Sequence, residues 1–549
     1  MKRIILTSII TAAASSAMAA ERAEIIVEVA PGADNIAAQV DFAEPVQDWG
    51  STEVVSVDAG SVEASIKLLR QLDDVISAEP NETVNAPTPP EQPLHLNRVM
   101  SVTSSSETVD AMFNDPLFSR QYAWETYNAQ NPGASSVSHA VGVSVPYRPL
   151  TVAVLDNGFT DTSSFNWAGG YNFATSSNSH SLPIGPDFYA KDINFEGVHG
   201  QEVASVIGGA QNDGLGNAGV LGNATFYASR VLGVDPASNT TAVLVNGLKW
   251  AIGEPVTNPD TGSAIPPIPE IPDIVNMSLG NDSQTSCPAA LQSAIDTAHS
   301  KGILVVVAAG NTDGTGTLQL TYPASCNNVL VVGATDQQGA AASFSKSGAA
   351  IDLSAAGQDI PVYSSAGGNQ VNGTSFSAPL AAGIIGNLWQ DIPGFTADEL
   401  TSLATGAVNP LTSGTNMGTG ILDASKLQED AIASIDPPDF ELRHPLEGIV
   451  GAQDMLAFLD RGGANYGHKR EVRINTSMAG KKAVVFQTDD TQSIASGGTT
   501  AIQGASGPRF LVDSWDSAKQ YGIQKCSSVS GTGCSANTLV PLDMPGASL

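Results

Sequence analysis

Positive charge is scarce in this chain. Its 549 residues include 24 Lys and Arg against 55 Asp and Glu, which gives a formal net charge of −31 at pH 7. This balance argues against nucleic acid as a partner, because proteins bind a polyanion through basic side chains. It is compatible with a protein that works in salt or binds cations, and also with a surface charge that only keeps the protein soluble.

Long hydrophobic runs are also missing. The apolar run of residues 4–14 follows Lys2 and Arg3 and is too short to anchor a helix in a bilayer. Residues 17–19, Ala-Met-Ala, supply the small side chains of a signal peptidase site. We therefore interpret residues 1–19 as a signal peptide. We expect an exported protein with no membrane anchor, either secreted into the medium or held in the periplasm.

Cysteine is rare, with four in the whole chain. In an exported protein we expect them to form disulfides, although free thiols are the alternative. Of the three possible connectivities, Cys287–Cys326 with Cys526–Cys534 keeps each pair within one predicted domain. In the loop-entropy model, a bridge that closes roughly 40 residues contributes up to about 4 kcal/mol.

Composition and periodicity divide the chain after the signal peptide. Residues 20–84 combine strand-like runs with apolar residues at helical spacing, which predicts a small α+β unit. Residues 85–113 are rich in Pro, Ser and Thr and are expected to form an exposed linker. Residues 431–549 contain stretches that alternate apolar and polar side chains, which predicts a small β-rich extension whose role the pattern does not define.

Residues 114–430 alternate short apolar strands with helices. Strands are expected at 151–156, 224–233, 273–280, 303–311 and 328–336, and helices at 199–210, 241–253 and 287–302. Continuous apolar strands separated by helices are typical of an α/β fold with a doubly wound, mostly parallel sheet covered by helices on both faces. The proline-rich stretch 254–272 cannot lie inside such a sheet and is expected at the surface.

Polar residues occur where this kind of sheet collects functional groups, beyond the carboxyl ends of its strands. Asp156 and Asn311 end two of the strands, whereas His199 and Ser375 begin helices. A serine hydroxyl becomes a nucleophile when an imidazole takes its proton, and a carboxylate fixes the tautomer of that imidazole. An asparagine amide and the N–H groups of a helix N-terminus can stabilise an oxyanion. We predict catalytic Asp156, His199 and Ser375, with Asn311 and Ser375 forming the oxyanion hole.

The sequence around these residues resembles the subtilisin-like serine peptidases of the subtilase family. VAVLDNG resembles the aspartate motif of that family, VHGQEVASVIGG the histidine motif and NGTSFSAPLAAG the serine motif. The order Asp, His, Ser differs from the order Ser, acid, His of the α/β-hydrolases. The resemblance implies a subtilisin-like fold and a serine endopeptidase that works through an acyl-enzyme and needs no cofactor for its chemistry.

Some positions depart from the family pattern. Asn157 stands where Ser or Thr is usual, Gln201 replaces a Thr, and Leu380 replaces a His. None of these changes removes a catalytic group, but they are the only support for a rival interpretation, an inactive scaffold used for binding. A lipase or esterase is a second rival, and the lack of a G-x-S-x-G elbow near Ser375 argues against it.

The resemblance also implies where a substrate binds. Two segments would form the walls of the main specificity pocket, namely Ser278, Leu279 and Gly280 on one side and Ala308, Ala309 and Gly310 on the other. An extended substrate would pair with them by β-augmentation. Neither wall carries a charge, so we predict a preference for large apolar side chains.

The partners implied are protein or peptide substrates and the chain's own N-terminal segment. Residues 20–84 resemble the propeptide of this family, which assists folding and inhibits the enzyme until it is cleaved. A parallel sheet has many non-local contacts and folds slowly, so a folding template would help. We predict self-cleavage within residues 80–114 and a monomeric enzyme.

Residues 214–219, GLGNAG, fit the pattern G-x-G-x-x-G but follow a helix and precede a strand, which is the reverse of a dinucleotide site. In the subtilase comparison this region resembles a loop that often binds calcium. Asn212, Asp213 and Asn217 offer the oxygen ligands that a structural calcium ion prefers. An ordinary Asn/Gly-rich turn is the alternative.

Overall fold

In the computed structural model, the described residues are 21–33, 35–85, 113–139, 149–160, 163–174, 183–189, 198–222, 224–233, 239–281, 283–312, 319–365, 367–391 and 395–434, together with the backbone of the strands named below beyond residue 440. The predicted signal peptide, residues 1–19, and most of the predicted linker lie outside these residues.

The N-terminal unit is an antiparallel sheet with a helix on one face. Its strands follow the order β2 (Glu44–Asp48), β3 (Thr52–Asp58), β1 (Arg22–Val29), β4 (Val75–Pro80), and its helix is α1 (Val62–Leu69). On β1, Ile25 and Val27 belong to the core under α1, whereas Ile26 packs into the core of the large domain. Successive side chains of a strand point to opposite faces, so this sheet is buried on both sides.

The large domain is built on a sheet whose strands follow the order β14–β15–β11–β10–β9–β8–β5–β7–β6. The neighbouring strands pair in parallel except for β14 and β15, which confirms the predicted mostly parallel sheet. The bounds are β5 (Thr151–Asp156), β6 (Asn166–Asn172), β7 (Thr225–Arg230), β8 (Ile274–Met277), β9 (Leu304–Ala308), β10 (Leu330–Thr335), β11 (Leu353–Ala356), β14 (Val408–Asn409) and β15 (Ile421–Leu422).

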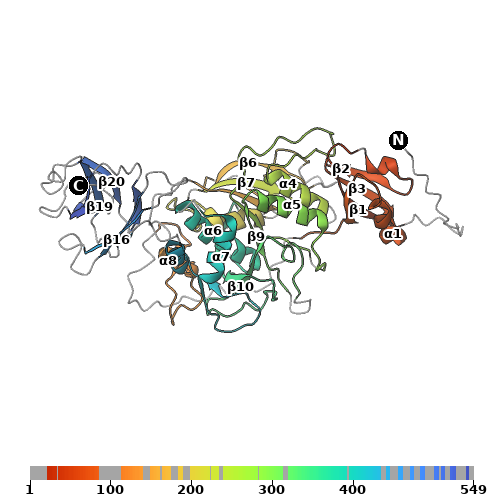
Figure 1. The fold of residues 1–549 in the computed structure, drawn as a ribbon. Helices are drawn as coiled ribbons and strands as arrows, with labels where there is room; N and C mark the ends of the chain where they lie inside the picture. Colours follow the sequence, from red (N-terminus) through yellow and green to blue (C-terminus); the bar gives the residue numbers. More distant parts are fainter. Residues whose placement is uncertain are drawn as a thin grey trace.

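Helices cover both faces of this sheet. One face packs against α3 (His199–Gly208), α6 (Thr374–Asp391), α7 (Ala397–Gly406) and α8 (Ala424–Ser434), and the other against α4 (Thr241–Ala251) and α5 (Ala289–Ser300). The side chains of β5 alternate between the two faces. Val152 and Val154 pack in the core beneath α3 and α6, whereas Ala153 and Leu155 pack in the core beneath α4 and α5. The N-terminal unit lies beside α4 and α5 (Figure 1).

Strand order places the candidate site. β5 pairs with β7 on one side and with β8 on the other, so the chain changes direction across the sheet at this strand. Ligands and catalytic groups of open α/β sheets gather beyond the carboxyl ends of the strands at such a point. Asp156 is the last residue of β5 and therefore lies at that edge.

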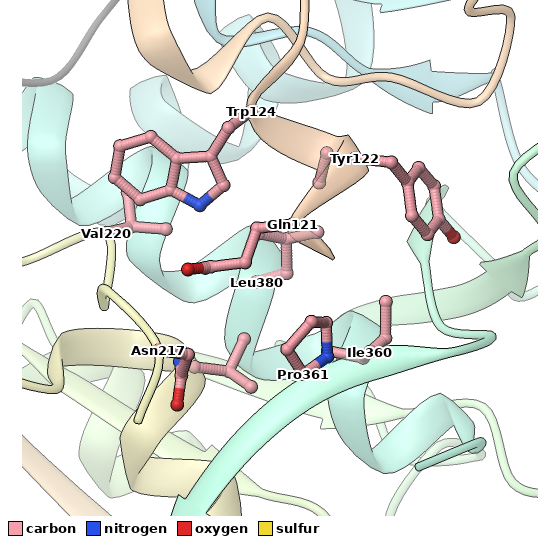
Figure 2. A pocket seen from close by; sticks show the side chains of 10 residues that line it. Gln121, Tyr122, Trp124, Asn217, Val220, Ile360, Pro361 and Leu380 are labelled. Carbon is pink, nitrogen blue, oxygen red and sulfur yellow. The ribbon is translucent and has the colours of Figure 1, made fainter. Parts of the chain in front are cut away.

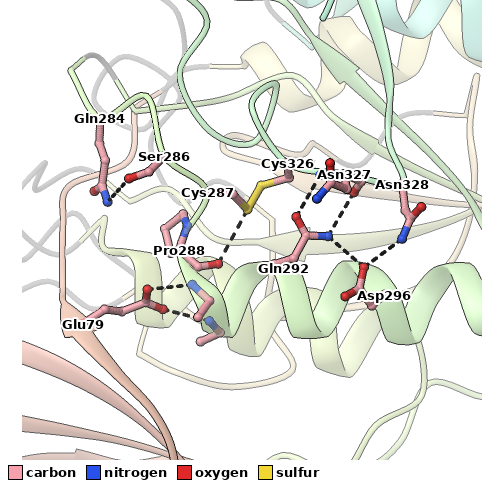
Figure 3. The surroundings of a disulfide bond; sticks show 12 residues. Glu79, Gln284, Ser286, Cys287, Pro288, Gln292, Asp296, Cys326, Asn327 and Asn328 are labelled. Carbon is pink, nitrogen blue, oxygen red and sulfur yellow. Dashed lines mark hydrogen bonds between the residues drawn. A yellow bond between two sulfur atoms is a disulfide. The ribbon is translucent and has the colours of Figure 1, made fainter. Parts of the chain in front are cut away.

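The predicted disulfide between Cys287 and Cys326 is present. It joins the segment before α5 to the segment before β10 (Figure 3). Beside it, the Gln292 side chain bonds the backbone of Asn327, and Asn328 donates to Asp296. Cys534 lies outside the described residues, so the Cys526–Cys534 pair stays a prediction.

The predicted extension is β-rich in its described parts. One antiparallel sheet has the order β16 (Glu441–Pro445), β17 (Met455–Asp460), β18 (Arg470–Ile474), β21 (Arg509–Val512). A second has the order β20 (Thr500–Ala505), β19 (Lys482–Thr488), β22 (Gln520–Cys526), β23 (Val540–Leu542).

The remaining elements of the described chain are short. They are the hairpin of β12 (Ile360–Ser364) and β13 (Gly367–Val371) and the 3-10 turns η1 (Ile36–Gln39), η2 (Ala59–Ser61), η4 (Phe118–Arg120), η5 (Tyr122–Trp124) and η6 (Val137–His139). Within the described residues, none of the helices is both long and apolar enough to cross a bilayer.

Candidate active site

The structure brings Asp156 and His199 into direct contact. His199 Nδ1 lies 2.7 Å from Asp156 Oδ1, and the same carboxylate oxygen accepts the N–H of Asn157 at 2.8 Å. Asp156 is fully buried and the His199 side chain is 12% exposed. A carboxylate in this position holds the imidazole with its proton on Nδ1, which leaves Nε2 as a proton acceptor.

Close backbone approach fixes the start of α3 against the end of β5. Gly200 N donates to Asn157 O at 3.0 Å, and a Cβ at position 200 would lie 2.1 Å from that same oxygen. Only glycine fits there. Gln201, which departs from the family pattern, strengthens the junction because its Oε1 accepts the N–H of Thr160 at 3.0 Å. The His199 ring is therefore placed by the backbone as well as by Asp156.

The protonation of His199 reflects competing influences. Burial lowers its pKa, but the charge of Asp156 and its hydrogen bond raise it, with a smaller increase from Glu202, and the net effect is a raised pKa. Glu202 lies one helical turn further along α3. Burial raises the pKa of Glu202 to about 7, against the lowering effect of His199. The sequence interpretation did not single out Glu202.

Ser375 lies in the first turn of α6, as predicted, and is 1% exposed. Its Oγ donates to Ser278 O at 3.4 Å, and Ser278 Oγ donates to Ser375 O at 2.9 Å. Among the described residues, His199 Nε2 has no hydrogen-bond partner, so Ser375 and His199 are not hydrogen-bonded to each other. The ring of Phe376, the next residue, packs edge-on against His199 with centroids 5.5 Å apart. Catalytic hydrogen bonds are often long without substrate and tighten in the reacting complex.

Hydrogen bonds to the side-chain oxygen of Asn311 orient its amide group and leave the amide nitrogen able to donate to an oxyanion. Its Oδ1 accepts the N–H of Thr374 at 3.0 Å and the Thr374 hydroxyl at 2.9 Å. That hydroxyl in turn accepts the N–H of Gly310 at 3.1 Å. In the described part of the chain, Asn311 Nδ2 is buried and makes no hydrogen bond, and it lies 3.3 Å from a Cβ position built at Gly373. The amide N–H therefore lies beside the start of the serine helix.

One predicted wall of the specificity pocket is bridged by the end of the N-terminal unit. Asn85 and Gly280 exchange backbone hydrogen bonds, Asn85 N to Gly280 O at 2.8 Å and Gly280 N to Asn85 O at 2.9 Å. On the other side, Val84 N donates to Asn239 O at 2.6 Å. The end of the N-terminal unit thus pairs with Gly280, the last residue of this wall, as an extended peptide would.

The second predicted wall, residues 308–310, begins at the last residue of β9. A buried lysine that the sequence interpretation missed, Lys346, lies next to this wall. Lys346 is 5% exposed, and its Nζ donates to Thr321 Oγ1 at 3.1 Å. Its backbone N–H donates to Gly310 O at 2.9 Å. Lys346 is far from both walls in the sequence and belongs to neither motif, so no spacing pattern signals it.

The residues predicted as calcium ligands make hydrogen bonds within the protein. Asp213 accepts the Ser164 hydroxyl at 2.6 Å and the N–H of Leu215 at 2.8 Å. Asn217 donates through Nδ2 to Ser205 O and lines a small pocket together with Gln121 and Trp124 (Figure 2). Within the described residues, no group of three or more His, Cys, Asp and Glu side chains could hold a metal.

Asp115 is a further carboxylate in this loop region, which the sequence interpretation did not identify. Its Oδ2 accepts the N–H of Asn212 at 3.0 Å, while its Oδ1 is buried without a hydrogen bond among the described residues. Burial raises the pKa of Asp115, the Asn212 N–H lowers it, and the neighbouring Asp213 carboxyl raises it again. Two adjacent carboxyl groups repel each other when both are ionised, and a cation between them would relieve that repulsion.

Parts of this chain are similar in sequence to known proteins. Residues 148–423 match the model of the subtilase family. An alkaline protease of Alkalihalobacillus alcalophilus is 32% identical over 335 residues, which are 59% of this chain and 78% of that protein. Subtilisin BL of Lederbergia lenta is 32% identical over 276 residues, which are 50% of this chain and 89% of that protein. A solved structure of proteases from Pseudoalteromonas arctica is 28% identical, covers 58% of this chain and 99% of that chain, and has a TM-score of 0.47.

Proposed function

This chain is a serine endopeptidase of the subtilase family, and on that premise we propose that it is exported and cleaves peptide bonds with a Ser375–His199–Asp156 triad through an acyl-enzyme. The observation that carries the proposal is the buried Asp156–His199 hydrogen bond. It holds the imidazole with Nε2 as the proton acceptor, beside helix α6, which has Ser375 in its first turn.

The reaction follows from these positions. Ser375 Oγ attacks the carbonyl carbon of the scissile bond while His199 Nε2 takes its proton, and Asp156 stabilises the imidazolium that forms. Asn311 Nδ2 and the backbone N–H of Ser375 donate to the oxyanion. His199 then gives its proton to the leaving amine, and a water molecule, deprotonated by the same imidazole, hydrolyses the acyl-enzyme.

The N-terminal unit, predicted as residues 20–84, acts as an inhibitory propeptide in this proposal. Its last residues occupy the edge of the wall along which a substrate would pair. Glu79 accepts the N–H groups of Ala289 and Ala290 at the start of α5, at 2.6 and 2.8 Å (Figure 3). A carboxylate at a helix N-terminus accepts hydrogen bonds from the free N–H groups, and the helix dipole stabilises its negative charge. In this proposal the unit keeps substrates from pairing with this wall until the chain is cut within residues 80–114.

A buried ion pair adds to this contact. Lys249 on α4 lies 3.4 Å from Glu28 Oε1 of β1, and both side chains are less than 10% exposed. Burial lowers the pKa of Lys249, although the charge of Glu28 raises it. If Glu28 is moved away, Lys249 is left as a partly buried charge without this partner, which is unfavourable. The ion pair therefore favours the one orientation of the N-terminal unit in which the two side chains meet.

A structural calcium ion is part of the proposal. The fit is partial, because the Oδ1 atoms of Asp115 and Asn217 are buried without a hydrogen bond among the described residues, whereas Asn212 Oδ1 accepts the N–H of Asn114 and both carboxylate oxygens of Asp213 accept hydrogen bonds. Bound there, the ion would supply positive charge between the carboxylates and no chemistry to peptide hydrolysis.

Calcium removal is expected to lower the unfolding temperature. At a free ion concentration of 100 times Kd, binding to the native state alone contributes about 2.7 kcal/mol. The measurement is thermal unfolding of the mature protein in calcium and in chelator, with Asp213→Asn, which removes a ligand charge, as the comparison. Equal unfolding temperatures of the wild-type protein in both buffers would contradict the calcium proposal.

The acid limb of kcat/KM against pH should depend on Glu202. Activity requires neutral His199, so it falls as the pH drops through the raised pKa of that imidazole. Glu202→Gln removes a nearby negative charge, and the limb should move to lower pH by roughly a few tenths of a unit. Glu254→Gln, which removes an exposed carboxylate that is salt-bridged to Lys301, is the control. No shift in E202Q, or an equal shift in the control, would contradict this assignment.

The function is tested by incubating the purified protein with casein, with and without a serine-directed inhibitor, and by sequencing the N-terminus of the matured chain. We expect inhibitor-sensitive cleavage and a new N-terminus within residues 80–114. Intact casein would favour the binding scaffold, and turnover of long-chain esters alone would favour an esterase. Because neither wall carries a charge, an apolar side chain is expected immediately before the scissile bond.

A further inference from the structure

The connection between β2 and β3 places a tryptophan of the N-terminal unit in the core of the large domain. Trp49 is fully buried, and the centroid of its ring lies 6.0 Å from that of Phe173. Ile26 of β1 and Val54 of β3 belong to the same core. Connections between strands usually lie at the surface, so a fully buried tryptophan in this one marks a contact with the large domain.

Hydrogen bonds within this connection close it tightly. Trp49 N donates to Thr52 O at 2.8 Å, and Asp48 Oδ1 accepts the N–H of Gly50 at 2.8 Å. Gly50 has a φ of +89°, a conformation that favours glycine. A Cβ built at Gly50 would lie 2.8 Å from Thr257 Oγ1. The connection therefore lies directly against residue 257 of the large domain.

The receiving side includes the proline-rich segment 254–272, which joins α4 to β8. This segment begins with a hairpin in which Thr257 pairs with Ala264. The backbone hydrogen bonds of the hairpin flank that pair, and the N–H of Thr257 donates instead to Trp49 O at 3.0 Å. The proline-rich segment thus supplies a backbone donor to the N-terminal unit.

Side-chain hydrogen bonds hold this segment beside three aromatic rings. Asn258 Nδ2 donates to Tyr171 Oη at 3.3 Å, and Trp250 Nε1 on α4 donates to Pro266 O at 2.9 Å. The rings of Tyr171, Phe173 and Trp250 contact one another, with centroids between 5.1 and 6.1 Å apart. The three rings and the N–H of residue 257 together form the tryptophan site, which offers aromatic surface to an indole and a donor to its carbonyl oxygen.

The tryptophan site is separate from the substrate wall. The end of the N-terminal unit reaches that wall through the backbone bonds between Asn85 and Gly280, and neither of these residues contributes to the tryptophan site. The unit is therefore attached at two places at once. When one attachment opens, the other keeps the unit at a high effective concentration, so that the first forms again quickly.

We propose that the tryptophan site is a docking site for the Trp49 connection, and that it supplies most of the affinity with which the cut N-terminal unit stays on the enzyme. The ligand is an indole on a closed turn of the chain's own N-terminal unit. The inference rests on the proposed function, in which this unit is an inhibitory propeptide. It makes the proline-rich segment the part of the enzyme that recognises its own inhibitor.

The chemistry of the two attachments supports this assignment. A buried tryptophan removes a large apolar area from water, and residues that dominate binding are often tryptophans in fully desolvated surroundings. The end of the unit pairs with the substrate wall through backbone hydrogen bonds, which an extended substrate also makes. A substrate therefore competes with the attachment at Gly280 and leaves the tryptophan site occupied.

The test uses the Ser375→Ala precursor, cut within residues 80–114 by a trace of wild-type enzyme that is then blocked with a serine-directed inhibitor. Size-exclusion chromatography over a dilution series measures the fraction of the cut unit that stays on this inert enzyme. We expect Trp49→Ala to raise the dissociation constant of the unit at least about 30-fold, the effect of truncating a dominant interface residue. Ile76→Ala, which truncates an exposed side chain on β4 of the same unit, should leave the constant unchanged.

Thr257→Pro tests the site from the enzyme side. Proline removes the N–H that Trp49 O accepts, whereas the hydrogen bonds of the hairpin that flank residue 257 have other donors. The dissociation constant should rise at least about threefold. An unchanged constant in Trp49→Ala, or in Thr257→Pro if the first variant does not fold, would overturn the inference and leave the inhibitory role of the unit intact. A precursor that the wild-type enzyme does not cut within residues 80–114 would overturn the proposed function itself.

Discussion

Ser375→Ala should leave a folded precursor that neither cuts itself nor cleaves casein at a measurable rate. Loss of the catalytic serine from subtilisin lowers kcat by about 2 × 10⁶, a magnitude carried over from that enzyme. The reason is structural, because Ser375 supplies the hydroxyl in the first turn of α6, and the next residue of that helix, Phe376, packs against His199. The measurement is maturation on a gel combined with kcat on casein.

Ser377→Ala serves as the matched control for this variant. Ser377 lies on the same helix and is buried, and its Oγ donates to the carbonyl oxygen of Thr374 at 3.2 Å. This variant should mature and cleave casein at a rate close to that of the wild type. A Ser375→Ala protein that still matures by itself in purified form would contradict both the assigned nucleophile and self-cleavage of the propeptide.

Asn311→Ala has the second largest expected effect. Removing one oxyanion donor from subtilisin lowers kcat by about 10²–10³, and we carry that magnitude over. KM should change little, because the amide N–H donates to charge that exists only in the transition state. In the structure Thr374 holds Asn311 Oδ1, which directs Nδ2 toward the start of the serine helix.

Steady-state kinetics of Asn311→Ala on one peptide separate the two parameters, and Asn369→Ala on the exposed hairpin strand β13 is the control. A fall in kcat/KM that comes from KM alone would show that Asn311 binds the substrate and not the oxyanion. An unchanged kcat would remove Asn311 from the oxyanion hole.

Much of the large domain could be predicted from the sequence. Its strands are short, continuous apolar runs because both faces of the sheet are covered. The polar residues at the ends of these strands are therefore easy to recognise in the sequence. Asp156 and His199 were paired correctly on this basis, because β5 and α3 meet at one edge of the sheet. Ser375 and Asn311 were identified from the sequence motifs that surround them.

Other features depend on contacts that no local pattern encodes. Strands β2 and β3 were not identified individually, and β2 contains Pro45 and a register shift, which weaken any strand signal. Lys346 enters the site from a segment that pairs with residues 310–312, and a single lysine in a polar stretch looks like a surface residue. Asp115 approaches Asp213 only after the chain has folded back by almost a hundred residues.

The central claim is that Ser375 is a nucleophile activated by the Asp156–His199 pair. The most direct measurement is covalent labelling of the matured protein by an active-site-directed phosphonate, with the modified residue located by mass spectrometry. The account predicts rapid labelling at Ser375. Because His199→Ala and Ser375→Ala are not expected to mature by themselves, their N-terminal unit is first removed by added wild-type enzyme; labelling should then be slower by several orders of magnitude in His199→Ala and absent in Ser375→Ala. A folded, matured wild-type protein that remains unlabelled, or that is labelled at another residue, would contradict it.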